Sequence, residues 1–391
     1  LLDNGGSSNT GYPGAEIILT APMQIIGNNS VGVAFETFAD LDGGTPFSPG
    51  AAADSNANVK KTSVLPMPST SRESVLNVDL AGSENTGLYF NHANTSANPF
   101  KVSKYTLNSN GGTKNAMVFI KTGFVDLAAK AKDNKHVNKI NITGGSGNTG
   151  IFTSAQWNTL NTGATINISD SNSSTGIYVQ KDKKSTLTTD ITVNNTGTIT
   201  VSGDAGTDNS LSSGIAVVEN AAYIGSDAIR AYNGKVTNNG TIAVSGGKAN
   251  TGMVLIVNAA DNITNTSAGK ITVSSTAGKQ NMGMRVDKGA VSTDSAGTPV
   301  AINEGKIHLS GDSSIGMASN KQSKITNSAT TSEITSDGAN VQNAIGMVTD
   351  GGTVENDSKI ELLGSGASTN TGVLLVNQNS GSTPSGTFGT N

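Results

Sequence analysis

Two neighbouring stretches decide the fold: Asn-Asn-Gly-Thr-Ile-Ala-Val-Ser-Gly at 238–246 and Asn-Thr-Gly-Met-Val-Leu at 250–255. In the first stretch, apolar side chains alternate with small or polar ones, which is the two-residue period of a strand with one buried face. The stretch opens with Asn-Gly and closes with Ser-Gly, and Asn and Gly both tolerate the left-handed backbone of tight corners. The two stretches therefore predict a strand, a corner and a second strand.

Versions of these stretches recur about every 32 residues along the chain. One kind of strand has an apolar-polar-apolar centre, found at 76–78, 140–142, 166–168, 199–201, 242–244, 271–273, 307–309 and 360–362. A second kind begins with Gly and an apolar residue, found at Gly32, Gly87, Gly150, Gly176, Gly214, Gly252, Gly283, Gly316, Gly346 and Gly372, with Ala116-Met117 taking the same place without the glycine. A third, weaker kind ends in Asn, found at 236–238, 263–265, 325–327 and 354–356. Three strands per repeat are therefore expected.

A repeat of this length suits three short strands and three corners. One such coil cannot bury its own Ile, Val and Met side chains, whereas stacked coils share a continuous core. We therefore predict an all-β fold, a right-handed parallel β-helix that forms a three-sided solenoid of about 11 coils with loop excursions, spanning 1–391 as one unit. Coils stacked about 4.8 Å apart would give a rod of roughly 50 Å, and corner asparagines would form side-chain amide ladders along its axis.

The composition excludes several classes of protein. The chain has 48 Gly, only 14 % charged residues and a formal net charge of -4, so it lacks the basic surface that binds nucleic acid or anionic membranes. It has no cysteine, which rules out a disulfide framework and thiolate zinc sites. We expect no nucleic-acid partner and no cofactor.

The longest departure from the repeat is a Pro/Gly-rich excursion at 36–73. Four of the nine prolines fall between 46 and 68, and proline cannot continue a central strand ladder. Loops on a rigid scaffold often carry function, so this segment is either a passive loop or a binding loop that displays Asp40, Asp42 and Phe47.

Two smaller excursions are expected at 128–139 and 153–162. The first is Lys-rich with a helical composition, which is typical of a solvated basic turn. The second contains the only tryptophan, Trp157, beside Asn158. An exposed Trp flanked by amides suits stacking on a sugar face, and a lid packed on the core is the alternative.

The sequence predicts neither catalysis nor a metal site. Its three histidines, His92, His136 and His308, have no metal-ligand spacing, and His308 takes an outward strand position where we expect it to be solvated. Sugar-cleaving β-helix enzymes need paired carboxylates or Asp clusters aligned over successive coils. The middle positions of the first kind of strand contain no such acidic row.

The repeated units, which cover most of residues 74–376, resemble the passenger domains of type V autotransporters. The resemblance is strongest to the large fusobacterial outer-membrane adhesins, both the arginine-inhibitable kind and their galactose-inhibitable, lectin-like relatives. It implies an extracellular β-helical stalk on the bacterial cell surface, anchored by a C-terminal outer-membrane barrel absent from this segment. The partners it implies are a host cell-surface protein or a galactose-type glycan, and other bacterial cells.

Three functions therefore stay open. The favoured one is a non-enzymatic adhesin segment, with Phe47 and Trp157 as apolar anchors and Asp40, Asp42 and Asn158 as polar contacts. The second is a structural spacer whose binding site lies elsewhere in a parent chain. The third is a β-helix carbohydrate-active enzyme or a phage-type fibre.

Overall fold

A computed structural model describes residues 22–36, 76–91, 100–102, 104–127, 136–154, 158–181, 192–203, 211–219, 235–257, 261–276, 279–288, 298–320, 322–328, 330–337, 341–364 and 369–376. Throughout these ranges the regular secondary structure consists of β-strands. No helix within them is long and apolar enough to cross a membrane.

The strands form three parallel sheets, one for each kind of strand expected from the repeat. Sheet A has eleven strands: β1 (Met23–Ile25), β3 (Leu76–Leu80), β6 (Tyr105–Asn110), β8 (Lys139–Thr143), β11 (Thr165–Ser171), β14 (Thr198–Gly203), β17 (Thr241–Gly246), β20 (Lys270–Val273), β23 (Lys306–Leu309), β26 (Glu333–Ser336) and β29 (Lys359–Glu361).

Sheets B and C are joined because one long strand, β7 (Ala116–Leu127), runs through both. Sheet B also contains β2 (Val31–Glu36), β4 (Thr86–Asn91), β9 (Thr149–Ser154), β12 (Thr175–Lys181), β15 (Ser213–Glu219), β18 (Thr251–Val257), β21 (Met282–Lys288), β24 (Ile315–Ser319), β27 (Ile345–Asp350) and β30 (Thr371–Val376). Sheet C also contains β5 (Phe100–Val102), β10 (Asn158–Thr162), β13 (Thr192–Asn195), β16 (Lys235–Asn238), β19 (Asn262–Asn265), β22 (Val300–Asn303), β25 (Lys324–Asn327) and β28 (Thr353–Asn356).

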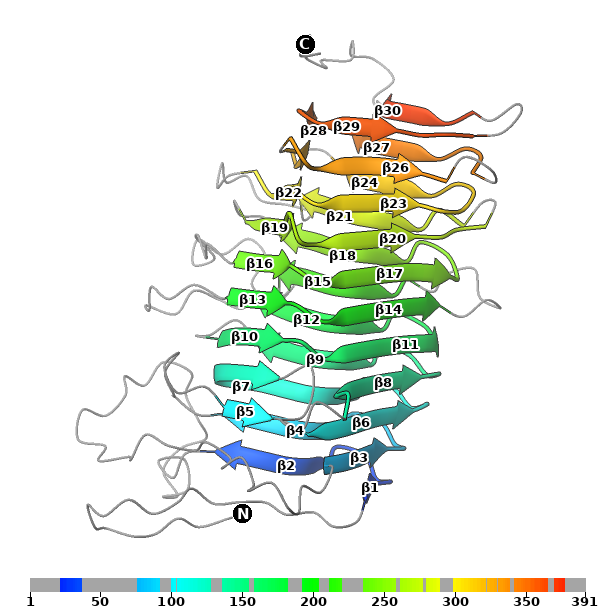
Figure 1. Cartoon of the computed structure of the whole chain (residues 1–391). Helices are drawn as coiled ribbons and strands as arrows, with labels where there is room; N and C mark the ends of the chain where they lie inside the picture. The colour runs from blue at the N-terminus through cyan, green and yellow to red at the C-terminus, as the bar shows by residue number, and fades with distance from the viewer. Residues whose placement is uncertain are drawn as a thin grey trace, which may run out of the picture.

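The chain winds through sheets A, B and C in that order and then starts the next coil (Figure 1). In Figure 1, sheet A faces the viewer and runs from left to right, sheet B runs back behind it, and the chain climbs from β1 to β30. This winding is right-handed. The predicted three-sided, right-handed parallel β-helix is confirmed, and sheet A counts eleven coils among the described residues.

The core is a narrow column of side chains that point inward from all three sheets. Isoleucine and valine dominate sheets A and C. On sheet B, four methionines of successive coils lie in register and are fully buried: Met253, Met284, Met317 and Met347. The thioether side chain is unbranched and adapts to irregular gaps, which suits a core that each coil fills with only a few residues.

The recurrent glycine of sheet B is required by close packing at the corner between sheets A and B. A methyl carbon placed on Gly214 would lie 2.6 Å from the carbonyl oxygen of Gly252 and 2.8 Å from Cγ2 of Ile242, both in the next coil. Real contacts of that length do not occur, so any side chain would push the coils apart. The glycine therefore marks where an isoleucine of the next coil packs over the backbone.

The predicted amide ladder is confirmed at the corner between sheets C and A. Each asparagine donates a hydrogen bond from Nδ2 to Oδ1 of the asparagine in the next coil, over distances of 2.8–2.9 Å, through Asn195, Asn238, Asn265, Asn303, Asn327 and Asn356. The first five are fully buried. A buried amide would cost free energy without these partners, so the ladder fixes the register of the coils.

A second ladder, the corner spine, runs between sheets A and B. Here a backbone N–H donates to a side-chain oxygen of the next coil, as from Asn85 to Asn115 (2.9 Å), from Asn148 to Ser174 (3.1 Å) and from Ser212 to Asn250 (2.8 Å). Either Asn or Ser can occupy the accepting position of the corner spine because the side chain of each supplies an oxygen acceptor.

Three sequence assignments need correction. Leu88 pairs with Val118, so Met117, not Ala116, stands opposite Gly87. Asp79 pairs with Asn108, so the apolar-polar-apolar centre of that sheet A strand is 78–80, two residues beyond the predicted 76–78. A shift of two residues keeps the alternation of apolar and polar side chains, so the sequence pattern cannot reveal it. The predicted 153–162 excursion is too wide, because β9 extends to residue 154 and β10 begins at residue 158.

Candidate functional site

The predicted binding residues fall almost entirely outside the described residues. Asp40, Asp42, Phe47 and Trp157 lie in undescribed segments, as do residues 37–73 and 128–135 of the predicted excursions. Asn158 is the first residue of β10, where its backbone pairs with Gly123 of β7. Their roles as ligand contacts stay predictions.

Chain length varies most at one corner of the rod, the corner between sheets B and C. At the corner between sheets C and A, by contrast, successive strands of the middle coils are separated only by turns such as 196–197, 239–240 and 304–305. The segments between a sheet B strand and the following sheet C strand are residues 92–99, 155–157, 182–191, 220–234, 258–261, 289–299, 320–323 and 351–352, and β7 passes this corner without a break. We call this the variable corner; β2, which precedes the longest predicted excursion, also ends there.

A row of aromatic rings lies on the outer face of sheet B, on the strands that lead to the variable corner. Tyr89, Phe119, Phe152 and Tyr178 occupy equivalent positions in four successive coils. Their ring centroids are 5.5, 4.8 and 5.4 Å apart, and the planes of neighbouring rings differ by 29°, 9° and 13°. All four side chains are half-buried.

The stacking decides what this aromatic row can contact. Each inner ring has both faces covered by its neighbours, so a partner meets ring edges and the tyrosine hydroxyls rather than open faces. Such pairs contribute roughly 0.5–1.5 kcal/mol each beyond burial. In the next two coils the row continues as Ala216 and Val254, which are 3 % and 7 % exposed. This row was not predicted from the sequence, although an aromatic residue two places after Gly87, Gly150 and Gly176 is the signal for it.

The outer face of sheet A carries two different surfaces. In the lower coils a ladder of side-chain hydrogen bonds runs along this outer face. Asn108 donates to Asp79 (2.6 Å), Asn141 to Asn108 (2.8 Å) and Asn167 to Asn141 (2.9 Å). In the upper coils the same face carries ion pairs. The lower coils thus present amides that end on the Asp79 carboxylate, whereas the upper coils present charges of both signs.

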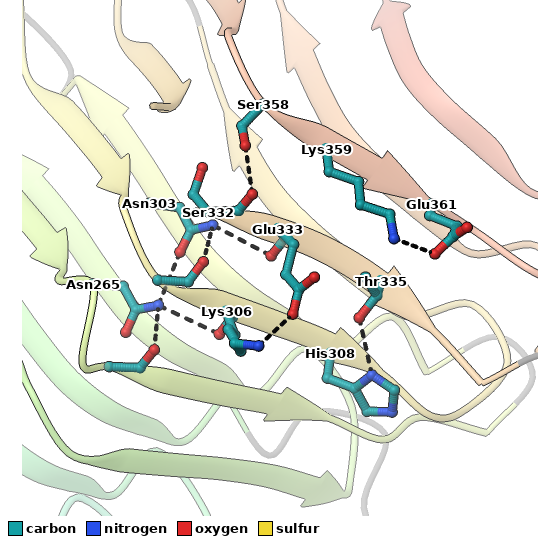
Figure 2. A network of polar contacts seen from close by, with 12 residues as sticks. Asn265, Asn303, Lys306, His308, Ser332, Glu333, Thr335, Ser358, Lys359 and Glu361 are labelled. Carbon is teal, nitrogen blue, oxygen red and sulfur yellow. Dashed lines mark hydrogen bonds and ion pairs between the residues drawn. The ribbon is translucent and has the colours of Figure 1, made fainter. Parts of the chain in front are cut away.

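Figure 2 shows the charged surface of the upper coils, where Lys306 pairs with Glu333 (2.8 Å) and Lys359 with Glu361 (2.6 Å). The hydrogen bond from Lys306 lowers the pKa of Glu333, helped by the positive charges of Lys306, Lys359 and His308. The hydrogen bond to Glu361 raises the pKa of Lys359, as does the negative charge of that carboxylate. The Lys306–Glu333 pair links β23 to β26, whereas the Lys359–Glu361 pair lies within β29, and together they hold charges of both signs on one face.

His308 lies in a Thr-His-Asp arrangement rather than in free solvent. Its Nδ1 is 3.2 Å from Thr335 Oγ1, and its Nε2 is 2.9 Å from Asp337 Oδ1. The expectation of a simply solvated histidine is therefore corrected. Hydrolytic triads combine these groups with N–H donors aimed at the developing oxyanion. Thr335 is instead inside β26, with strand partners His308 and Glu361 on its two sides, so the ladder engages its backbone and the arrangement acts as a clamp between coils.

Among the described residues, no three His, Asp or Glu side chains gather into a group that could hold a metal ion. Comparisons with family models, with curated proteins and with solved structures find no match to this chain.

Proposed function

We propose that this chain is an extracellular segment of a bacterial surface adhesin of the autotransporter type, and that it attaches to cells through segments displayed along the variable corner. The proposal rests first on the resemblance of the repeated units to adhesin passengers. The observation that carries it is the corner between sheets B and C, where the chain ranges from no break at all, inside β7, to residues 220–234, a wider range of length than at either of the other two corners.

The rod suits display because its coils are held in one register by buried ladders. An insertion at the variable corner begins and ends on strands whose neighbours on both sides are fixed. Such a scaffold tolerates changes of loop length with a small entropic cost. Different segments can therefore present contacts side by side along one edge, next to the aromatic row.

The partner class is a host cell-surface protein or a galactose-type glycan. Half-buried ring edges and tyrosine hydroxyls are typical of the amphipathic contacts that aromatic residues make at protein interfaces. A glycan would need an open ring face, which the two inner rings of the row, Phe119 and Phe152, do not offer, and Trp157, between β9 and β10, is the candidate that the sequence suggests for supplying one. Trp157 is therefore expected to be needed for binding a glycan and not for binding a protein.

The two ends of β15 allow a matched test. Replacing residues 220–234, at the variable corner, with a short Gly-Ser linker should lower attachment to host cells or partner bacteria by about tenfold or more. The control replaces residues 204–210, which join β14 to β15 at the corner between sheets A and B, and should leave attachment unchanged. Equal losses in both variants would contradict a role for the variable corner.

Deleting residues 40–70 tests the predicted binding loop separately. The β-rich circular dichroism spectrum should persist, and attachment should be lost if Asp40, Asp42 and Phe47 contact the receptor. Loss of galactose-sensitive attachment in Trp157→Ala would identify a glycan. Attachment that resists galactose and withstands this substitution would identify a protein receptor.

A further inference from the structure

The aromatic row belongs to a longer run of outer residues that is symmetric about its midpoint. From β2 to β15, the equivalent outer positions of sheet B hold, in register, Ala34, Tyr89, Phe119, Phe152, Tyr178 and Ala216. This order of residue types reads the same in both directions, and its midpoint lies between β7 and β9. The ring spacings share the symmetry, because the central distance of 4.8 Å is flanked by distances of 5.5 and 5.4 Å. A half-turn about the midpoint therefore exchanges tyrosine with tyrosine and phenylalanine with phenylalanine.

The run has the relief of a ridge with a low step at each end. Its four rings are half-buried, whereas the methyl groups of Ala34 and Ala216 extend less far from the sheet than the rings beside them. Two β-sheets that pack face to face lie about 10 Å apart and fill the space between them with side chains of both sheets. Aromatic residues are enriched in protein interfaces. The ridge therefore fits a partner surface that carries rings at the same coil spacing and over the same length.

The charges of the same strands favour one orientation of a partner with this surface. β4 and β9 contain no charged residue, whereas the sheet B part of β7 contains Lys121 and β12 ends in Lys181. A half-turn about the midpoint places β7 opposite β9 and β12 opposite β4, so each strand with a lysine meets an uncharged strand. A parallel pair in register would instead place Lys121 opposite Lys121 of the other copy, and opposed like charges weaken an interface.

We propose that two copies of this chain pair side by side and antiparallel through this run of outer residues. Phe119 of each copy lies next to Phe152 of the other, and Tyr89 next to Tyr178. Both copies use the same surface, so the contact is isologous and closes at a dimer. The tyrosines place a hydroxyl group at each end of the ring contact, which suits the polar rim of an interface. This proposal is independent of the adhesin function, which rests on the variable corner.

Sedimentation velocity of the full chain over a wide concentration range tests the pairing. The unmodified chain should change from monomer to dimer as its concentration rises, with no larger species. Phe119→Lys should weaken the dimer by about a hundredfold, because it places a charge from each copy at the centre of the contact. Val348→Lys, at the equivalent outer position of β27 and outside the symmetric run, is the matched control and should dimerise like the unmodified chain.

Cross-linking tests the orientation without placing a charge in the contact. The chain has no cysteine, so a single introduced thiol reports one position. A mixture of the Tyr89→Cys and Tyr178→Cys chains, treated with a short bismaleimide, should give cross-linked dimers that contain one chain of each kind. Either variant alone should give few, because an antiparallel pair holds its two identical positions three coils apart. This measurement decides the proposal even if Phe119→Lys does not fold.

Three outcomes would overturn the proposal. The first is an unmodified chain that stays monomeric at every concentration. The second is a dimer that survives Phe119→Lys in a folded chain, or one that is lost with Val348→Lys instead. The third is cross-linking within each cysteine variant alone, which would indicate a parallel pair. Cell attachment is not measured, so failure here leaves the proposed function unaffected.

Discussion

The lower and upper coils share one backbone geometry but are held together by different side chains. In the lower coils, rings stack along sheet B from Tyr89 to Tyr178, and amides pair along the outer face of sheet A. In the upper coils, a buried asparagine ladder runs from Asn195 to Asn356, and ion pairs replace the outer amides. Neighbouring coils therefore need side chains that complement each other in register, and the chemistry of these side chains can change along the rod.

The buried ladder of the upper coils should give the largest effect. Asn265→Ala removes a side chain that accepts from Asn238 and donates to Asn303, which leaves buried polar atoms without partners. We expect a loss of about 3 kcal/mol in the free energy of unfolding, measured by chemical denaturation. Asn167→Ala, at the end of the outer amide ladder in the lower coils, is the control and should cost less than about 1 kcal/mol. Equal losses would show that burial does not separate the two ladders.

The corner glycines offer a comparison between the middle and the end of the rod. Gly252→Ala would place a methyl carbon 2.6 Å from the carbonyl oxygen of Gly283 and should cost about 2 kcal/mol or more. Gly372→Ala meets no atom within 4 Å and should be nearly neutral for unfolding of the isolated chain. A similar cost at both positions would point to backbone conformation, rather than to crowding by the next coil, as the reason for glycine.

The aromatic row of the lower coils should contribute a smaller amount. Phe119→Leu keeps an apolar side chain but removes two ring contacts, one with Tyr89 and one with Phe152. We expect a loss of about 1–2 kcal/mol, read from thermal and chemical unfolding. The matched control is Val348→Leu, which introduces a leucine at the equivalent outer position of β27 and should change stability little. An unchanged Phe119→Leu variant would mean that the rings do not stabilise the lower coils.

The charged surface of the upper coils should give the smallest and most pH-dependent effect. Hydrogen bonds from Lys306 and Lys324 lower the pKa of Glu333 and Glu355 respectively. Because each pKa is lower in the folded state, the stabilisation is present above the unfolded pKa and is lost as the pH falls below about 4.5 through the folded value. Each pair is worth less than about 1 kcal/mol at these partly exposed positions.

The double variant Glu333→Gln and Glu355→Gln should therefore be slightly less stable at neutral pH and should lose less stability than the unmodified chain on acidification. Unfolding titrations at neutral and acidic pH measure the difference. An identical acid response in both proteins would mean that these ion pairs do not stabilise the fold.

The regular part of the fold could be predicted from the sequence because burial imposes a strict pattern on it. The alternation of apolar and polar side chains identified the strands. The recurring glycines of sheet B, such as Gly214, marked the corner where the next coil packs over the backbone. The register at 76–78 was wrong because a slip of two residues keeps every side chain on its correct face.

The outer surfaces were harder to predict because they depend on which residues of different coils meet. Phe119 and Phe152 are adjacent only after the coils stack, and the contact of His308 with Thr335 and Asp337 likewise joins two coils. The predicted binding residues Asp40, Asp42, Phe47 and Trp157 lie where the repeat is interrupted, so the pattern that locates the strands carries no information on their arrangement.

The most direct measurement is attachment of the purified chain to cultured host cells and to partner bacteria, with and without galactose, N-acetylgalactosamine and arginine as competitors. The adhesin proposal predicts saturable attachment to at least one of these surfaces, with competition by a sugar if the receptor is a glycan. A chain that folds as a β-rich rod yet attaches to none of them would contradict the proposal and leave the rod as a structural spacer.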